Sequence, residues 1–528
     1  MKKKYVSMVL AATMIASLIS GCGNSADNKT TEQAGDMPKE AVNEDGLVEI
    51  HVTRPSVVDF SPWSGYDGFN IFYQLYDQLV TVDENGEIQP DLAESWEVSD
   101  DRTEYTFKLR DDVKFTNGDP MTAEDVAWSI NQAIASPNIT ALTTAWKSAE
   151  VIDDHTVKIT LDYGYNYFLQ MLSTSAGSIC NKKVVEAADG NFAGGLEGAG
   201  TGAFAVKEYE SGSHLTFAAN PEYYKGASEL DIVVMDIIND KSTASISLQS
   251  GDVDYNDQIN FTDVEGLKAT EGIEMIEQDE MRTVYLMCNL SDQASASPIA
   301  NPKVREAITY AVNRQDIQDY AYEGAGCLQS SLNYSTWPGY EDEPQIERDV
   351  DKAKKLMEEA GYGDGCTLSL TYNTEYLSTF PDVAVLLQSQ LAEIGINLEI
   401  NPLNVSALTD VLGAGTYGDL FMNANGCFND PFSWYDYLMS GSAIQSTNWT
   451  YWSSDTVDEL IVKGRTSESD EEVAAVMDEL REELWKEWPV IPLCTSGMRY
   501  AAYNSNKITG CRVDFDFDYE IYDWKLVK

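Results

Sequence analysis

Basic residues and histidine are scarce in this sequence. Its 528 residues include 35 Lys and Arg against 87 Asp and Glu, which gives a formal net charge of −52, and only 3 His. A surface of that sign repels phosphate backbones and offers no basic face to anionic lipids. We therefore expect neither a nucleic-acid partner nor an electrostatic membrane contact. With so few histidines, histidine-rich metal sites and most histidine-based catalysis are disfavoured.

The common catalytic and nucleotide-binding motifs are also missing. The chain contains no CxxC, HExxH, G-x-S-x-G or P-loop pattern, which argues against zinc ribbons, zinc proteases, serine hydrolases and NTPases. A glycosidase needs two facing carboxylates, but 87 acids make some such pair inevitable, so this observation carries no weight. We expect no enzymatic activity, no cofactor and no metal ion.

Long hydrophobic runs are absent beyond the first 22 residues. Three lysines at positions 2–4 precede the apolar run 9–19, which is too short to span a bilayer comfortably and is followed by Ser-Gly-Cys. This pattern is typical of a bacterial lipobox, in which the Cys22 thiol takes a diacylglycerol. The alternative is an ordinary signal peptide with an accidental cysteine. We expect residues 1–21 to be the signal peptide.

The segment 22–45 has almost no large apolar side chain, so it cannot bury enough surface to offset its ordering entropy, and we predict a flexible tether. A lipid at Cys22 would then hold the protein at the extracytoplasmic face of the cell membrane, in the periplasm if the cell has an outer membrane. We expect no other contact with the membrane.

Seven cysteines follow Cys22, and an odd number leaves at least one thiol unpaired within a monomer. Scattered buried thiols are the simpler interpretation. A single disulfide between Cys494 and Cys511 is the alternative.

Strand-like and helix-like patterns alternate along the chain, which predicts an α/β class. Residues 105–109 and 157–161 alternate apolar and polar side chains, as half-buried strands do. Thr122 and Asp125 form a capping-box pattern ahead of an apolar helical stripe. Further stripes of helical period cover 302–312, 350–360, 381–394 and 473–488.

Several of these segments, taken in order, match the sequence blocks of a known family. They are Gln89–Trp96, Tyr105–Phe115, Asn117–Val126, Gly200–Phe204, Asn220–Gly226, Gly251–Asp254, Val304–Arg314, Glu359–Tyr362 and Trp488–Leu493. The chain thereby resembles the large extracytoplasmic solute-binding proteins of ABC importers, of the oligopeptide, dipeptide and nickel type (family 5). The blocks contain turn glycines and core residues rather than obvious ligand groups, so they identify the scaffold and not the cargo.

The resemblance implies a periplasmic-binding-protein-like α/β fold (type II, cluster C) of two lobes that enclose a ligand by hinge closure, with an extra inserted domain. Lobe I would be discontinuous, made of 46–72, 200–284 and 496–528. The inserted domain II would be 73–199 and lobe III 285–495. The chain should cross between the lobes near Arg282–Cys288 and Pro492–Thr495.

The resemblance also points to cargo-binding residues and raises a question about the cargo. Peptide-binding members hold the ligand ammonium with an Asp three residues before the Asp of an Asp-Pro pair. Here that pair begins at Asp430, and the aligned residue is Cys427. Thr374 stands where dipeptide binders have an Arg, and Asn425 and Gly426 would face the ligand backbone. Either the cargo lacks these two charges, as a sugar or a modified peptide does, or Asp430 or another acid takes the ammonium.

Three aromatic residues are further candidates. Trp63 and Tyr66 lie in a segment that leads into the cleft in this family, and Trp434 closely follows the Asp-Pro pair. Their rings could stack on a sugar, an aromatic side chain or a peptide plane. For Trp63 and Trp434 the alternative is packing between the lobes.

The predicted function is that of a lipid-anchored, monomeric substrate-binding component of an ABC importer. It would capture a small solute between two lobes and present it to a membrane permease whose ATPase is a separate subunit. An oligopeptide or dipeptide is the favoured cargo. The alternatives are a non-peptide solute, such as an oligosaccharide or a nickel complex, and a surface receptor or adhesin on the same scaffold.

Overall fold

The computed structural model describes residues 42–43, 45–54, 60–64, 69–83, 86–279, 282–334, 337–340, 344–426, 430–513 and 519–528. The predicted signal peptide, the lipidation site Cys22 and nearly all of the tether therefore lie outside the described residues, as do the candidate residues Tyr66 and Cys427. Within the described part of the chain, no helix is long and apolar enough to cross a membrane.

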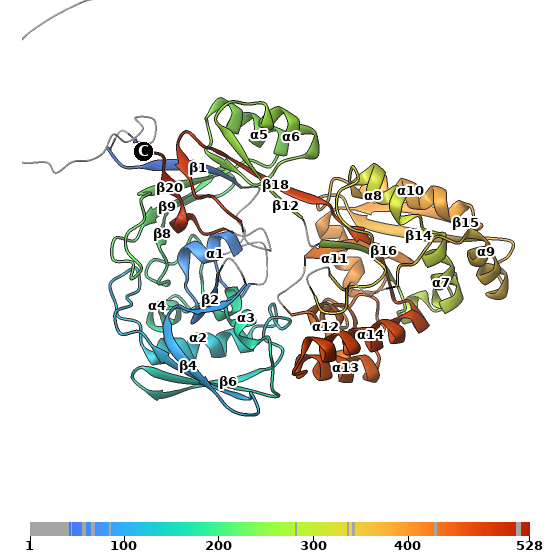
Figure 1. Ribbon diagram of the computed structural model, residues 1–528, viewed down its shortest axis with the longest axis horizontal. Helices are drawn as coiled ribbons and strands as arrows, with labels where there is room; N and C mark the ends of the chain where they lie inside the picture. Colours follow the sequence, from blue (N-terminus) through green and yellow to red (C-terminus); the bar gives the residue numbers. More distant parts are fainter. Residues whose placement is uncertain are drawn as a thin grey trace, which may run out of the picture. The chain divides into compact units, whose positions relative to one another are not determined.

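A seven-stranded mixed sheet gathers strands from three distant parts of the chain. In spatial order its strands are β12 (Ile273–Asp279), β18 (Met498–Asn504), β11 (Tyr255–Asn256), β1 (Glu49–Arg54), β10 (Ile232–Ile237), β9 (His214–Ala219) and β8 (Phe204–Glu210). β1 is parallel to β10 and β11. The helices α5 (Lys241–Ser250) and α6 (Phe261–Lys268) share a small apolar core with β18 (Figure 1).

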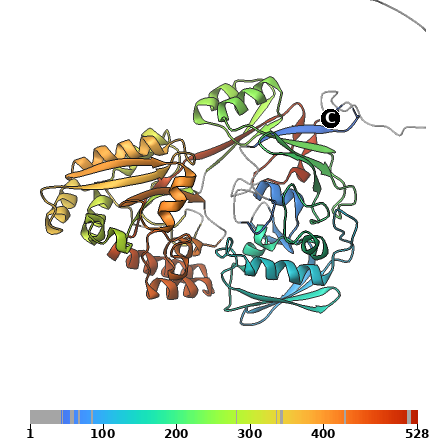
Figure 2. The ribbon, with the colours of Figure 1, turned by 180° about the vertical axis from the view of Figure 1, so that it is seen from behind.

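A second, separate sheet has four strands and is antiparallel throughout. Its strands run in the order β4 (Ala93–Val98), β5 (Glu104–Leu109), β7 (Thr156–Leu161) and β6 (Trp146–Asp153). Alternate residues of β5 and β7 are buried, which confirms the predicted strand pattern. α2 (Ala123–Ala135) packs on this sheet (Figure 2) and begins at the predicted capping box, in which Thr122 and Asp125 bond to each other's backbone.

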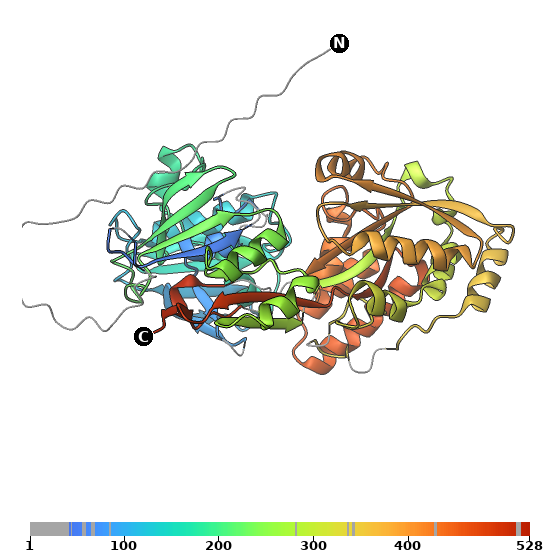
Figure 3. The ribbon, with the colours of Figure 1, turned by 90° about the horizontal axis from the view of Figure 1, so that it is seen from above.

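A five-stranded sheet carries helices on both faces. Its order is β15 (Ile396–Leu403), β14 (Cys366–Asn373), β16 (Leu420–Gly426), β13 (Arg282–Cys288) and β17 (Val490–Thr495). One face shares an apolar core with α7 (Pro302–Ala311), α8 (Arg314–Ala321), α9 (Val350–Glu359) and α10 (Phe380–Ala392). The other shares one with α11 (Val405–Gly413), α12 (Ser433–Met439), α13 (Asp455–Arg465) and α14 (Asp470–Glu487) (Figure 3).

Shorter elements complete the chain. These are α1 (Phe69–Leu75), β2 (Val80–Val82), β3 (Ile88–Pro90), α3 (Phe168–Leu172), α4 (Lys182–Ala187), β19 (Ile508–Thr509) and β20 (Lys525–Leu526).

The chain crosses between the seven-stranded and five-stranded sheets twice, once from β12 to β13 and once from β17 to β18. β12 pairs with β18 in the first sheet, and β13 pairs with β17 in the second. The chain passes from β12 to β13, builds the five-stranded sheet and its helices, and returns from β17 to β18. The alternation of strands and helices confirms the α/β class. The exact limits of the three domains stay a prediction.

The disulfide alternative was wrong. All six described cysteines are free; Cys494 lies in the core of the five-stranded sheet, whereas the partly buried Cys511 packs against a different core. Cys180, Cys288 and Cys494 are buried, as scattered structural thiols are. Burial raises the pKa of Cys288 and of Cys494 to about 12, so neither thiol is a reactive thiolate at neutral pH.

Candidate functional site

Three predicted site residues lie at one edge of the five-stranded sheet. β14 and β16 are parallel, so their carboxyl ends meet there. Thr374 directly follows β14, and Asn425 and Gly426 end β16. β13 runs antiparallel to β16 and begins at the same edge, with Arg282 opposite Gly426. The carboxyl edge of parallel strands is where α/β sheets commonly bind ligands.

Two tyrosines and two asparagines form an uncharged hydrogen-bonding group at this edge, which we call the amide–tyrosine cluster. The Tyr285 hydroxyl donates to Asn425 Oδ1 (3.0 Å), and Asn423 Nδ2 donates to the same oxygen (3.1 Å). The Tyr334 hydroxyl donates to the Asn425 carbonyl (3.3 Å) and accepts from the Thr283 amide (3.0 Å). Asn423 and Asn425 are half-buried, so they border solvent while their orientation is fixed.

Trp434 supports this cluster from behind. It belongs to α12 and is 1 % exposed. Its ring centroid lies 6.4 Å from that of Tyr285 and 6.0 Å from that of Tyr437, both edge to face. The indole is therefore a core ring in this structure, and stacking of Trp434 on a cargo stays a prediction.

Asp430 is engaged by the protein itself. It is fully buried, and its Oδ2 accepts from the Tyr165 hydroxyl (2.8 Å) and from Arg465 Nε (2.8 Å). Its Oδ1 accepts from the Phe432 amide (2.9 Å). Arg465 also donates through Nη1 to Asp436 Oδ2 (2.8 Å). Both Asp430 oxygens are thus occupied by partners from the chain, which leaves this carboxylate poorly placed to receive a ligand ammonium.

Thr374 is exposed and turned toward β15. Its amide and its hydroxyl both donate to the Leu403 carbonyl, at 2.9 and 3.3 Å. Nearby, the Arg282 guanidinium lies over the Tyr376 ring at 5.3 Å, which places a cation at the same edge of the sheet.

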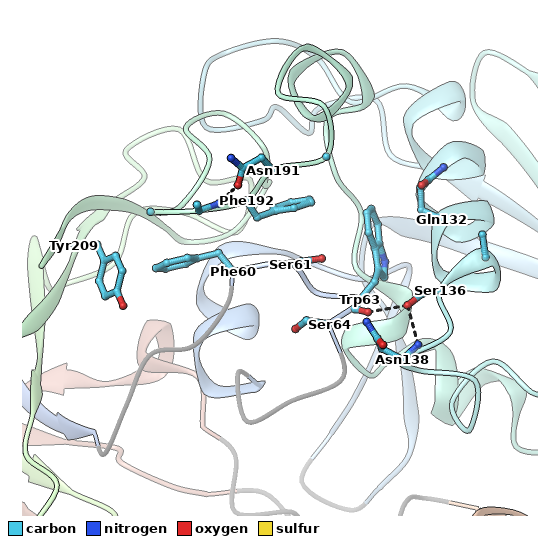
Figure 4. A pocket seen from close by; sticks show the side chains of 14 residues that line it. Phe60, Ser61, Trp63, Ser64, Gln132, Ser136, Asn138, Asn191, Phe192 and Tyr209 are labelled. Carbon is cyan, nitrogen blue, oxygen red and sulfur yellow. Dashed lines mark hydrogen bonds between the residues drawn. The ribbon is translucent and has the colours of Figure 1, made fainter. Parts of the chain in front are cut away.

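Trp63 lies elsewhere, in the wall of a cavity of about 600 Å³ (Figure 4). It is 8 % exposed, its carbonyl accepts from Ser136 Oγ (2.8 Å), and its ring meets that of Phe192 edge to face at 5.9 Å. Its indole Nε1 has no hydrogen-bond partner among the described residues. The lining comes from 60–64, 132–138, 190–194 and Tyr209, so this cavity does not include the edge of the five-stranded sheet.

Three of the sequence blocks meet in an ionic cluster around two buried carboxylates, those of Asp77 and Asp91. Lys225 Nζ lies 2.8 Å from Asp91 Oδ1, which also accepts from the Tyr224 hydroxyl. The neighbouring Asp77 accepts from Tyr223 and Thr201, both at 2.7 Å. Burial, and then repulsion from Asp77, raise the pKa of Asp91 to about 6 against the opposing effect of Lys225. These blocks therefore build the scaffold, as their residue types suggested.

The sequence reasoning missed Tyr285, Tyr334 and Asn423. A signal for Asn423 existed, because alternation along a strand places it on the same face as Asn425. Tyr285 and Tyr334 reach Asn425 from 140 and 91 residues away, and no local pattern reveals such contacts.

Comparison with known proteins agrees with this architecture. The profile of bacterial extracellular solute-binding proteins, family 5 (middle), matches residues 87–446. Heme-binding protein A of Haemophilus influenzae is 28% identical over 539 residues, covering 94% of each chain. The dipeptide-binding protein of Escherichia coli is 27% identical over 441 residues, covering 78% of this chain and 81% of its own.

A solved structure shows the same similarity. The ABC transporter-associated periplasmic binding protein of Helicobacter pylori, in complex with a peptide, superposes with a TM-score of 0.77 at 25% identity, covering 91% of this chain and 98% of its own. The chain therefore belongs to family 5 of the bacterial extracellular solute-binding proteins, and the predicted two-lobed α/β fold is confirmed. It is the extracytoplasmic substrate-binding component of an ABC importer, in a family of transport proteins.

Proposed function

We propose that this protein binds a peptide at the carboxyl edge of the five-stranded sheet and delivers it to a permease and its ATPase. The observation that carries the proposal is the amide–tyrosine cluster. Its amides and hydroxyls are the groups that pair with peptide N–H and C=O groups, and Asn425 lies at the carboxyl end of the central strand β16. Relatives named for dipeptide and peptide binding support this cargo class.

The charge of the cluster narrows the peptide class. Asp430 is occupied by Tyr165 and Arg465, and the members of the cluster are all uncharged. A cationic amine placed against them would lose its hydration without gaining a counter-charge. We therefore expect the peptide to place an uncharged group, such as an internal amide or a capped N-terminus, against the amide–tyrosine cluster.

A non-peptide solute is the second candidate. The cluster would equally suit sugar hydroxyls, and a relative that covers 94% of this chain is named for heme binding. In either case the protein binds and releases its cargo without chemical change and acts as a monomer. Residues 22–45 tether it to the membrane through the lipid on Cys22.

The decisive experiment uses the soluble chain lacking residues 1–22. Native mass spectrometry would identify any co-purified solute, and thermal shifts would follow with tri-alanine, N-acetyl-tri-alanine, maltotriose and nickel with histidine. We expect the largest shift with the acetylated peptide. Shifts with maltotriose or nickel alone would overturn the peptide assignment. Steady turnover of any of these compounds by repurified protein would overturn the binding-only assignment.

A further inference from the structure

The short segment between β7 and α3 reaches the residues that follow β16. Its sequence, Tyr-Gly-Tyr-Asn-Tyr at 163–167, places tyrosines at alternate positions. The Tyr165 hydroxyl donates to Asp430 Oδ2 (2.8 Å), and Tyr163 Oη lies 3.4 Å from Arg465 Nη1. The rings of Tyr167 and Phe432 lie 6.5 Å apart. All three tyrosines thus meet residues that are 265 or more positions away along the chain.

The backbone at the centre of this segment is held as well. The Asn166 amide donates to the Arg465 carbonyl (3.0 Å), where α13 ends. Its side-chain Nδ2 donates to the Ser467 carbonyl, and its Oδ1 accepts from Arg102. The contact therefore involves both main chain and side chain, which fixes its register as well as its position.

The charged side chains that the segment 163–167 contacts explain why it supplies hydrogen-bond donors. Arg465 contacts two carboxylates, that of the buried Asp430 and that of the partly exposed Asp436. Tyr165 donates to the first carboxylate, and Thr144 Oγ1, from the same part of the chain, donates to the second (3.1 Å). Hydrogen bonds to ionised groups are the stronger kind, and here they replace the water that burial removes.

Asp430 and Phe432, which the tyrosines contact, belong to the predicted cargo-binding segment. Asp430 stands four positions after Gly426, the last residue of β16, and its carbonyl accepts from the Ser433 amide (3.0 Å) and hydroxyl (2.7 Å) at the start of α12. α12 carries Trp434, which packs behind Tyr285 of the amide–tyrosine cluster. Asp430 therefore connects the segment 163–167 to the wall on which the cargo would lie.

We propose that Tyr165 and Asn166 are positioning residues of a clasp that holds the inserted domain against Asp430 and the C-terminal end of α13, and that this clasp slows the release of cargo. Asp430 serves as the anchor of this clasp. The inference about cargo release rests on the proposed function. The clasp itself does not, and it can be tested without any cargo.

The test compares Tyr165→Phe with a matched control, Tyr417→Phe, in the soluble chain lacking residues 1–22. Each change deletes one hydroxyl from a fully buried tyrosine, but the Tyr417 hydroxyl donates to the Trp449 carbonyl (2.6 Å), away from the clasp. The first readout is hydrogen exchange of the Asn166 amide without cargo. We expect it to rise about tenfold in Tyr165→Phe and to stay within twofold of wild type in Tyr417→Phe.

The second readout is the dissociation rate of N-acetyl-tri-alanine, which we expect to rise several-fold in Tyr165→Phe alone. Unchanged exchange at Asn166, or an equal rise in the control, would overturn the clasp. If exchange rises but the dissociation rate of bound peptide does not, the effect on cargo release is wrong while the contact stands. If the peptide fails to bind even the wild type, the proposed cargo fails, and the exchange measurement still decides the clasp.

Discussion

At the residue scale, the clearest feature of the site is that Asn425 occupies a position where a carboxylate would fit. Its Oδ1 accepts two hydrogen bonds, from Tyr285 and Asn423, and a carboxylate oxygen can accept both. Asn425→Asp therefore adds a negative charge with little change in shape. The charge should attract an ammonium group that the native cluster does not.

We expect Asn425→Asp to shift the ratio of dissociation constants for tri-alanine and N-acetyl-tri-alanine by about tenfold in favour of the free amine, which corresponds to ~1.4 kcal/mol. Isothermal titration calorimetry with both peptides measures this ratio. Asn397→Asp, at an exposed position on β15, is the matched control and should leave it unchanged. An unchanged ratio in Asn425→Asp would remove Asn425 from the cargo site.

Asp91 gives a second prediction at this scale, in pH dependence. Because burial raises its pKa from 3.8 to about 6, the folded state binds this proton more readily than the unfolded chain does. Stability from this group is full below pH 4 and is lost as the pH rises through 6, by on the order of 3 kcal/mol. Asp91→Asn cannot titrate, so its deficit relative to wild type should shrink as the pH rises from 4 to 7.

Urea unfolding at several pH values measures this deficit. Asp91→Asn also removes the ion pair with Lys225, but this pair forms only as Asp91 ionises, and its effect is already contained in the pKa of about 6. Asp252→Asn, at an exposed site, is the control and should follow the wild-type pH profile. A deficit of Asp91→Asn that grows with pH would contradict the raised pKa.

At the element scale, the sequence predicted what depends on near neighbours. The capping box at Thr122 and Asp125 and the alternating burial of β5 follow from spacings of two to four residues. The helical stripe predicted over 302–312 forms a helix that begins at Pro302, with Asn301 as its N-cap. Such patterns are local because a helix turn and a strand pleat each repeat within four residues.

The site is built from contacts between residues far apart in the chain, which local sequence patterns do not reveal. Tyr165 and Asp430 are 265 residues apart, and the sequence alone suggested Asp430 as an acid for the cargo because its burial and its partner Arg465 could not be seen. The disulfide between Cys494 and Cys511 was a similar error, since closeness in sequence did not bring the two thiols to one core. The sequence showed which functional groups a residue carries, but not whether those groups are free to bind a ligand.

A prediction at this scale concerns the packing of α13. Gly464 precedes Arg465, and a Cβ added there would lie 2.1 to 2.7 Å from ring atoms of Phe432. Gly464→Ala should therefore destabilise the protein by about 1–3 kcal/mol, although alanine favours a helix in isolation. Gly413→Ala, at the end of α11, would meet nothing within 4 Å and should be neutral or slightly stabilising. Urea unfolding compares the two, and equal stability would contradict the close contact.

At the scale of the whole molecule, the net charge of −52 is the feature that most affects solubility and stability. With 87 acids against 35 basic residues, most acidic side chains lack a basic partner and repel one another. The ion pairs that do form between exposed side chains, such as Lys183 with Asp119, contribute little. The acidic excess favours solubility but works against the compact state.

Salt should therefore stabilise this protein. Raising NaCl from about 10 mM to 500 mM shortens the screening length from roughly 30 Å to below 5 Å, which weakens long-range repulsion more than contacts between buried partners. We expect the Tm to rise by several degrees over this range, measured by differential scanning calorimetry. Sucrose of equal osmolality is the control for a general solute effect, and it should give the smaller rise. A Tm that falls with NaCl would mean that attractive ion pairs such as Lys225 with Asp91 outweigh the repulsion, which their small number makes the less expected balance.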